Sequence, residues 1–105
     1  MNKIKVLVQK PMMPPVVTEI DNTLKGWQSV VDGYVETVTL KDGLVVICNE
    51  EGGLYGLDYC CLIDGIDFVG TVFIAHVDEN DEGELRGLTD KEVVLLKYGN
   101  RIRMQ

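Results

Sequence analysis

Regular alternation of polar and hydrophobic residues begins near the amino terminus. Over Lys3–Gln9, two lysines alternate with isoleucine and valine, which is the period of a strand with one buried face. Three prolines interrupt the pattern over Lys10–Pro15, where a strand could not keep its backbone hydrogen bonds. The strand pattern resumes over Val16–Ile20. We therefore predict a hairpin of two strands joined by a proline-rich loop.

A helical period follows this predicted hairpin. Leu24, Trp27 and Val31 are three and four residues apart, so they share one face of a helix. Asp21 or Asn22 is suited to cap its first turn. Trp27 is the single tryptophan, and we expect it to anchor this helix against a sheet.

The stretch Gly33–Gly56 carries the clearest pairing signal in the chain. It starts at the glycine that we expect to end the helix, and it contains two apolar runs on either side of Asp42-Gly43. This dipeptide is typical of a two-residue hairpin turn, which would place Val38 opposite Ile47. The two strands of this hairpin are predicted over Tyr34–Leu40 and Leu44–Cys48.

The segments after this hairpin are less regular. Leu57–Phe68 mixes apolar and acidic residues and is predicted as a short helical or extended segment, whereas the apolar run Val69–Val77 is predicted as a central strand. Asp78–Glu84 follows with five carboxylates. It matches the first positions of a calcium-binding loop, but Thr89 stands where a bidentate glutamate is required. We therefore expect a solvated turn without a metal.

The range Leu88–Gly99 has the clearest helix signature. Thr89 and Glu92 form a capping-box pair at its start, and Gly99 is suited to a left-handed stop. The tail Asn100–Gln105 is predicted to fray or to pair as an edge strand. Together the elements predict an α+β fold, with a single small domain over residues 1–105. We expect a mainly antiparallel sheet with two helices packed on one face.

Composition narrows the classes of function. The chain has 105 residues, of which 46% are hydrophobic, enough for one core. The net charge of −7 argues against a nucleic-acid partner, because affinity for phosphate backbones comes mainly from clustered lysine and arginine. An acidic surface suits a basic protein partner, or simply keeps the protein soluble. A homo-oligomer is compatible with so small a domain.

Cysteine usage and hydropathy indicate the compartment. Cys48, Cys60 and Cys61 form an odd set without metal-binding or redox spacing, so we expect three reduced thiols. No signal peptide is evident, and no run approaches the roughly 20 apolar residues of a membrane span. We therefore expect a cytoplasmic protein with no membrane partner.

Signatures of catalysis are missing from the sequence. There is no glycine-rich phosphate loop, nucleophile motif or metal-ligand spacing, and His76 has no evident partner. The acids Glu36, Glu50 and Glu51 are expected to be solvated. We therefore predict that the protein is not an enzyme and needs no cofactor.

The loop that follows the central hairpin is the predicted site. It combines a polar strand end with paired glycines and a tyrosine. Glycines let a backbone approach a ligand, tyrosines stack on bases, and an arginine from the tail would meet a phosphate. The predicted ligand-binding residues are Asn49, Gly52, Gly53, Tyr55, Tyr34, Arg101 and Arg103.

Several motifs spread over most of the chain together carry a family resemblance. They are Glu19-Ile20-Asp21-Asn22, Gly33-Tyr34-Val35-Glu36, Asp42-Gly43, Asn49-Glu50-Glu51-Gly52, Leu54, Gly56-Leu57, Gly70–Val77 and Leu88-Thr89-Asp90. With these motifs the chain resembles a family of small phage and bacterial proteins, domain of unknown function 3846. The family usually has a proline and then an Asn-Arg pair after the Gly-Leu motif, whereas Asp58 stands at the proline position here. The resemblance implies a phage or mobile-element accessory protein, a type that often counters host defences in the host cytosol.

Three functions fit these features. The first is a non-enzymatic binding protein that sequesters a small nucleotide-like ligand in the loop pocket. The second is an acidic inhibitor or DNA mimic that covers a basic host protein. The third is a structural or oligomerisation module without a ligand. We favour the first, because the polar glycine loop is a more local feature than the net charge.

Overall fold

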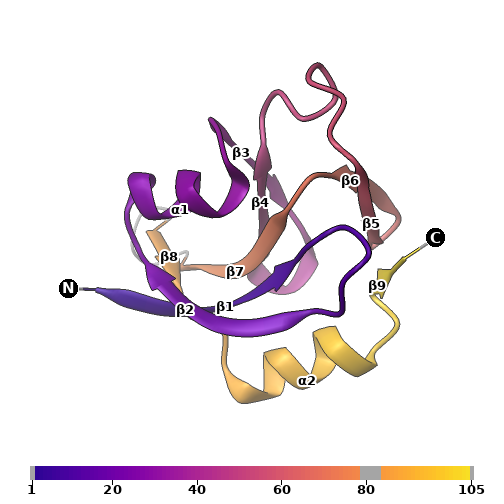
Figure 1. The fold of residues 1–105 in the computed structure, drawn as a ribbon. Coiled ribbons are helices and arrows are strands. Elements are labelled where there is room, and N and C mark those ends of the chain that lie inside the picture. Colours follow the sequence, from indigo (N-terminus) through magenta and orange to yellow (C-terminus); the bar gives the residue numbers. More distant parts are fainter. Residues whose placement is uncertain (1, 79–83, 105) are drawn as a thin grey trace.

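A six-stranded sheet forms the centre of the molecule, and a three-stranded sheet lies beside it (Figure 1). The computed structural model describes residues 2–78 and 84–104. The large sheet has the strand order β2–β1–β7–β4–β3, with β8 pairing to β7, and the small sheet has the order β6–β5–β9. The elements are β1 (Lys3–Gln9), β2 (Val16–Asp21), α1 (Leu24–Val31), β3 (Val35–Thr39), the 3₁₀ turn η1 (Lys41–Gly43), β4 (Leu44–Asn49), β5 (Tyr59–Ile63), β6 (Ile66–Val69), β7 (Val72–Asp78), β8 (Glu84–Arg86), α2 (Asp90–Tyr98) and β9 (Ile102–Arg103).

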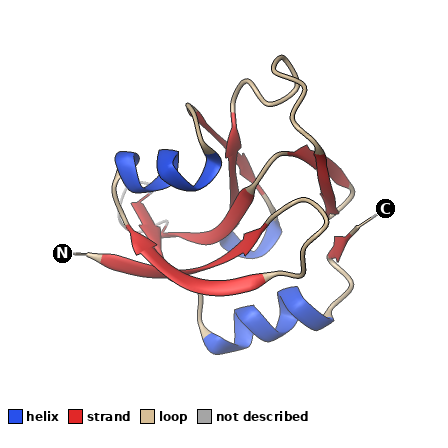
Figure 2. Cartoon of the chain, in the orientation of Figure 1, coloured by secondary structure: helices blue, strands red, loops and turns tan. Residues whose placement is uncertain are grey.

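The predicted α+β class is confirmed. Strands and two α-helices alternate irregularly along the chain (Figure 2). All strand pairs in the described part of the chain are antiparallel. The predicted hairpin of the first two strands is present, with Val6 of β1 opposite Thr18 of β2.

The two helices cover opposite faces of the large sheet, which corrects the expectation that both pack on one face (Figure 1). Val31 of α1 packs in one cluster with Ile47 and Phe73, whereas Leu96 of α2 packs in a second cluster with Ile74. The central strands β4 and β7 have no polar face along most of their length, and β4 is buried at every residue. Both faces of the sheet therefore need an apolar cover.

The register of the central hairpin differs by one residue from the prediction. Val38 lies opposite Val46 and not opposite Ile47. The connection has three residues, because the Leu40 amide donates to the Leu44 carbonyl (2.8 Å) and closes the loop around η1. A shift of one residue moves every side chain of a strand to the opposite face relative to its partner. In β4 this shift leaves no apolar residue in water, because both faces are buried.

A second hairpin occupies the region that the sequence left ambiguous. The strands β5 and β6 pair around Asp64-Gly65, where both residues have positive φ values (48° and 82°). Positive angles at both central positions are the requirement of a tight hairpin turn, and Asp-Gly is a favoured dipeptide there. The predicted strand Val69–Val77 is divided accordingly, since Val69 ends β6 and β7 begins at Val72.

Both helices are capped, although not wholly as the sequence predicts. Thr23, rather than Asp21 or Asn22, caps α1 by accepting a hydrogen bond from the Gly26 amide (3.0 Å). The capping box of α2 between Thr89 and Glu92 is confirmed. Gly99 is not left-handed, with a φ value of −93°. Asn100 takes the positive φ value instead, at 60°.

The remaining predictions concern the tail, the acidic turn and the cysteines. The tail pairs as an edge strand, since β9 lies beside β5. Most of the predicted acidic turn Asp78–Glu84 lies outside the described residues, although its two end residues are paired in the β7–β8 hairpin. The three cysteines are free and buried. In the described ranges, neither helix has the length and apolar character of a membrane span.

Candidate functional site

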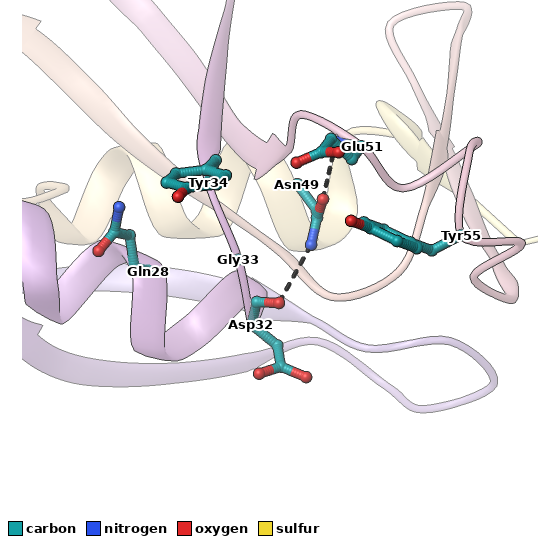
Figure 3. A pocket seen from close by; sticks show the side chains of 7 residues that line it. All are labelled: Gln28, Asp32, Gly33, Tyr34, Asn49, Glu51 and Tyr55. Atoms are coloured by element: carbon teal, nitrogen blue, oxygen red, sulfur yellow. Dashed lines mark hydrogen bonds between the residues drawn. The ribbon is translucent and has the colours of Figure 1, made fainter.

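A pocket of about 340 Å³ opens where α1 ends and the loop after β4 begins (Figure 3). Its walls come from the last turn of α1, the residues that lead into β3, the end of β4 and the following loop. We call it the tyrosine pocket, and its lining residues are Gln28, Asp32, Gly33, Tyr34, Asn49, Glu51 and Tyr55. Its volume lies at the lower end of the roughly 300–1,000 Å³ typical of ligand sites.

Asn49 holds the floor of this pocket together. Its side-chain amide donates to the carbonyl groups of Val31 (3.1 Å) and Asp32 (3.2 Å), and its Oδ1 accepts from the Glu51 amide (2.8 Å). Both amide hydrogens are therefore committed to the end of α1. Asn49 links the helix to the loop, and it has no donor left for a ligand.

The chain passes very close to Asn49 at Gly33. A Cβ atom at this glycine would lie 2.6 Å from Asn49 Nδ2, closer than real Cβ contacts allow. The preceding residue Asp32 has a left-handed conformation (φ 60°), and its amide bonds to the Gln28 carbonyl. The helix stop thus turns the chain sharply across Asn49 and starts β3 at the edge of the pocket.

The loop after β4 forms the opposite wall. Its backbone is fixed by hydrogen bonds from the Glu50 amide to the Tyr34 carbonyl (2.8 Å) and from the Tyr55 amide to the Glu51 carbonyl (3.0 Å). Figure 3 shows the phenol of Tyr55 pointing towards Asn49 from the loop side, with Tyr34 beyond Asn49. Tyr34 and Tyr55 are 66% and 68% exposed, so two aromatic side chains are displayed around one hollow.

The charged groups of the tyrosine pocket are all acidic. Asp32 and Glu51 are its two acidic lining residues, and none of the seven is lysine, arginine or histidine. Figure 3 shows the Asp32 carboxylate pointing away from Asn49 and the tyrosines, so Glu51 carries the carboxylate beside them. Tyrosine rings present a negative face and bind cations over it. The pocket is therefore suited to an ammonium or guanidinium group, and it offers no positive charge to a phosphate.

The structure brings together only part of the predicted site. Asn49, Tyr55 and Tyr34 line the tyrosine pocket. Gly52 is buried in the base of the loop, where a Cβ atom would lie 2.9 Å from a methyl group of Val69. Gly53 lines a separate hollow of about 210 Å³ between β3 and β6.

The two arginines of the tail lie elsewhere. Arg101 forms a two-pronged ion pair with Asp64, with 2.8 Å between its Nε and Oδ1, and it also lies 3.7 Å from a carboxylate oxygen of Asp42. Asp42 is in the turn at the far end of β4 from Asn49, so Arg101 is not available to a ligand in the tyrosine pocket. Arg103 is in β9, opposite Leu62 of the small sheet.

Sequence reasoning missed Gln28, Asp32 and Glu51 as lining residues. The first two lie in the last turn of α1 and directly after it, far from the loop in sequence, and the bonds of Asn49 to Val31 and Asp32 join this end of the helix to the loop. Glu51 was expected to be a solvated acid. The signal available in the sequence was Asn49, two residues before Glu51 at the end of a strand. A polar residue at a buried position usually bonds to nearby backbone groups, so Asn49 indicated that other segments meet this loop.

The single histidine is bonded within a charged cluster on the other face of the sheet. His76 Nδ1 lies 2.7 Å from Glu92 Oε2, while Arg86 and the Thr89 amide contact Glu92 Oε1 (3.3 and 2.9 Å). Burial raises the pKa of Glu92, but the hydrogen bonds from Thr89 and His76 and the charge of Arg86 lower it below its usual value overall. This cluster joins β7, β8 and α2, and it is a structural contact.

Comparison with known proteins identifies the family. The model of the family described as Domain of unknown function (DUF3846) matches residues 4–103. The chain belongs to this family. The match spans nearly all of the sequence and confirms the resemblance carried by the motifs. No curated protein and no solved structure matches the chain.

Proposed function

We propose that the protein is a non-enzymatic binding protein that takes a lysine or arginine side chain of a basic partner protein into the tyrosine pocket. The observation that carries this proposal is the lining itself, in which two exposed tyrosines accompany the Glu51 carboxylate without a basic side chain. Enriched tyrosine and complementary charge are common features of protein interfaces. It shares its basic partner protein with the second of the three functions considered from the sequence, the acidic inhibitor or DNA mimic, but places the contact in one pocket.

The charge of the pocket favours this function over nucleotide binding. Tyr34 and Tyr55 could stack on a base, but the phosphates would meet the Glu51 carboxylate and no positive charge. The expected phosphate ligand Arg101 is bound to Asp64 instead. A cationic side chain can contact both an aromatic ring and the Glu51 carboxylate, and cation–π contact contributes about 0.5–2 kcal/mol.

The loop after β4 offers further apolar surface besides the tyrosines. Leu54, at the tip of the same loop, is 80% exposed. The loop that carries Glu51 and Tyr55 of the pocket therefore also displays an exposed leucine. A basic side chain whose neighbours are apolar fits a loop with these residues, because apolar contacts beside an ion pair exclude water from it.

Calorimetric titration with an acetylated tri-arginine peptide tests the proposal. The affinity should fall strongly as the salt concentration rises from about 50 to about 500 mM, because the ion pair between arginine and the pocket lies near the surface. A matched peptide with citrulline in place of arginine has the same shape without the charge, and it should bind at least roughly fivefold more weakly. The Tyr55→Ala and Glu51→Gln variants should each lose affinity for the arginine peptide.

Control variants and a nucleotide panel complete the experiment. Tyr98→Ala changes another exposed tyrosine, on α2 at the opposite face of the sheet, and it should leave the affinity unchanged. Equal binding of the citrulline peptide would contradict a cation site. Binding of cyclic or ADP-ribose nucleotides, without binding of the arginine peptide, would favour ligand sequestration.

A further inference from the structure

The strand β2 leaves one edge of the large sheet open. In residues 2–78 and 84–104, β1 is the only strand that pairs with β2, which stands first in the strand order. The backbone groups along its outer edge therefore have no sheet partner. Such an edge pairs readily with another strand unless charge, proline or a bulge protects it.

The edge of β2 carries no charge on the face towards α1. On that face the strand presents Val16, Thr18 and Ile20, and Val16 is 52% exposed. A groove of about 390 Å³ runs between this strand and α1, with Val30 and Met13 among its lining residues. We call it the edge groove. Exposed apolar surface beside an open strand indicates an interface.

The sequence of β2 is complementary to itself. When two copies pair antiparallel about a two-fold axis at Thr18, Thr18 faces Thr18, and Val16 of each copy faces Ile20 of the other. On the opposite face, Val17 faces Glu19. Cross-strand apolar pairs and threonine pairs stabilise a sheet, and no like charges meet in this register.

Charge also selects this register over its neighbour. A shift of the axis by one residue along β2 would place Glu19 directly opposite Glu19, which is unfavourable. A shift in the other direction would bring the prolines that precede β2 into the pairing, and prolines cannot donate to a ladder. The register centred on Thr18 is thus the one that the pattern of side chains favours.

We propose that a second copy of this chain binds the open edge of β2, in the register that pairs Thr18 with Thr18, and that the two large sheets join into one. The contact is isologous, because each copy offers the same strand. The two α1 helices then lie on the same face of the joined sheet, with the edge grooves between them. The tyrosine pocket adjoins β3 at the other end of the strand order, so it stays open in each copy.

The strand β3 provides a matched comparison. It is the other end of the large sheet, and Thr37 on it is exposed like Thr18. Its flank differs, because residues of β6 line a hollow together with Glu36 of β3. Thr18→Lys and Thr37→Lys make the same substitution on the two exposed edges of the sheet. In the proposed dimer, only the lysine at position 18 would face the same residue of the second copy.

Sedimentation velocity over a range of concentrations tests the proposal. The wild type and Thr37→Lys should form dimers, whereas Thr18→Lys should be a monomer with an unchanged circular dichroism spectrum. Thr18→Glu should also be a monomer alone. An equimolar mixture of Thr18→Lys and Thr18→Glu should recover the dimer, because opposite charges then face each other across the axis.

Each outcome bears on the proposal. Recovery in the mixture identifies position 18 as self-paired, and it also shows that both variants are folded. A wild type that is monomeric up to about 1 mM would overturn the proposal. So would a dimer that persists in Thr18→Lys but is lost in Thr37→Lys, which would assign the interface to β3.

Discussion

Asn49 is the residue on which the geometry of the candidate site depends most. Its three hydrogen bonds join the end of α1 to the loop after β4, and only 9% of the residue is exposed. A buried polar group whose partners are removed costs about 1–3 kcal/mol. Asn49, which the sequence predicts to contact a ligand, therefore also supports the structure of the pocket that it lines.

Replacement of Asn49 should destabilise the protein. Asn49→Ala leaves two carbonyls and one amide without partners, so we expect a loss of about 1–3 kcal/mol in the free energy of unfolding, measured by urea denaturation. Asn2→Ala removes an exposed amide at the amino end, and it should change stability by less than about 0.5 kcal/mol. Equal stability of the two variants would show that the Asn49 bonds contribute nothing.

Two glycines near the pocket should respond differently to a methyl group. In Gly33→Ala the added Cβ would collide with the Asn49 amide, so we expect a loss of about 1–3 kcal/mol. Gly53 has open space around the same position and no positive φ value. Gly53→Ala should therefore be neutral or slightly stabilising. Melting curves of both variants measure the difference, and equal shifts would contradict the predicted crowding at Gly33.

At the scale of elements, α2 is attached to the sheet by a carboxylate that serves two purposes. Glu92 completes the capping box and also meets His76 and Arg86 from β7 and β8. Its pKa in the folded protein is lowered overall. The stabilisation is therefore present above the unfolded pKa, and it is lost as the pH falls through the folded value.

Glu92→Gln should flatten this dependence on pH. Glutamine preserves an acceptor for the capping box but cannot carry the charge. At about pH 7 we expect the variant to have a lower free energy of unfolding in urea than the wild type. Between pH 7 and about pH 3, this free energy should fall much less in the variant than in the wild type. Glu84→Gln, an exposed acid on β8, should keep the dependence of the wild type. An unchanged dependence in Glu92→Gln would rule out this carboxylate as its source.

Among the elements, the tail is attached by the pairing of β9 with β5 and by the ion pair between Arg101 and Asp64. Hydrogen bonding to Arg101 lowers the pKa of Asp64, against the effect of burial. Asp64 is in the turn of the β5–β6 hairpin, and its amide also bonds to the Arg101 carbonyl (3.0 Å). Asp64→Asn should thus speed hydrogen exchange in residues 101–104 while leaving β4 and β7 protected. An equal increase in the exchange rate along the whole chain would contradict a local role of this ion pair in attaching the tail.

At the scale of the whole molecule, the cysteines report global unfolding. All three are buried, and burial together with the nearby Glu36 raises the pKa of Cys48 to about 11. A thiol must ionise before it reacts with a disulfide reagent. The native protein should therefore show almost no reactive thiol, and three after unfolding in guanidinium. Thr37→Cys, at an exposed strand position, should add one fast-reacting thiol and confirm that the reagent reaches the surface.

Local signals in the sequence determined the elements whose partners are close along the chain. The β1–β2 hairpin, the central hairpin and the capping box of α2 follow from alternation, an Asp-Gly turn and a Thr-Glu spacing. The same local signals placed Asn49 and Tyr55 in one polar loop. Turn length was harder to predict, because Asp42-Gly43 fits both a two-residue and a three-residue connection, and the choice shifts the register by one.

Only the tertiary structure decided features that depend on partners far apart in the sequence. The opposite placement of the helices follows from the burial of β4 and β7 on both faces, and burial is a property of the assembled sheet. Arg101, the expected phosphate ligand, is paired with Asp64, while the bonds of Asn49 join the end of α1 at Asp32 to the loop at Glu51. The charge of the candidate site therefore emerges from these long-range contacts, because no local pattern fixes which side chains share a pocket.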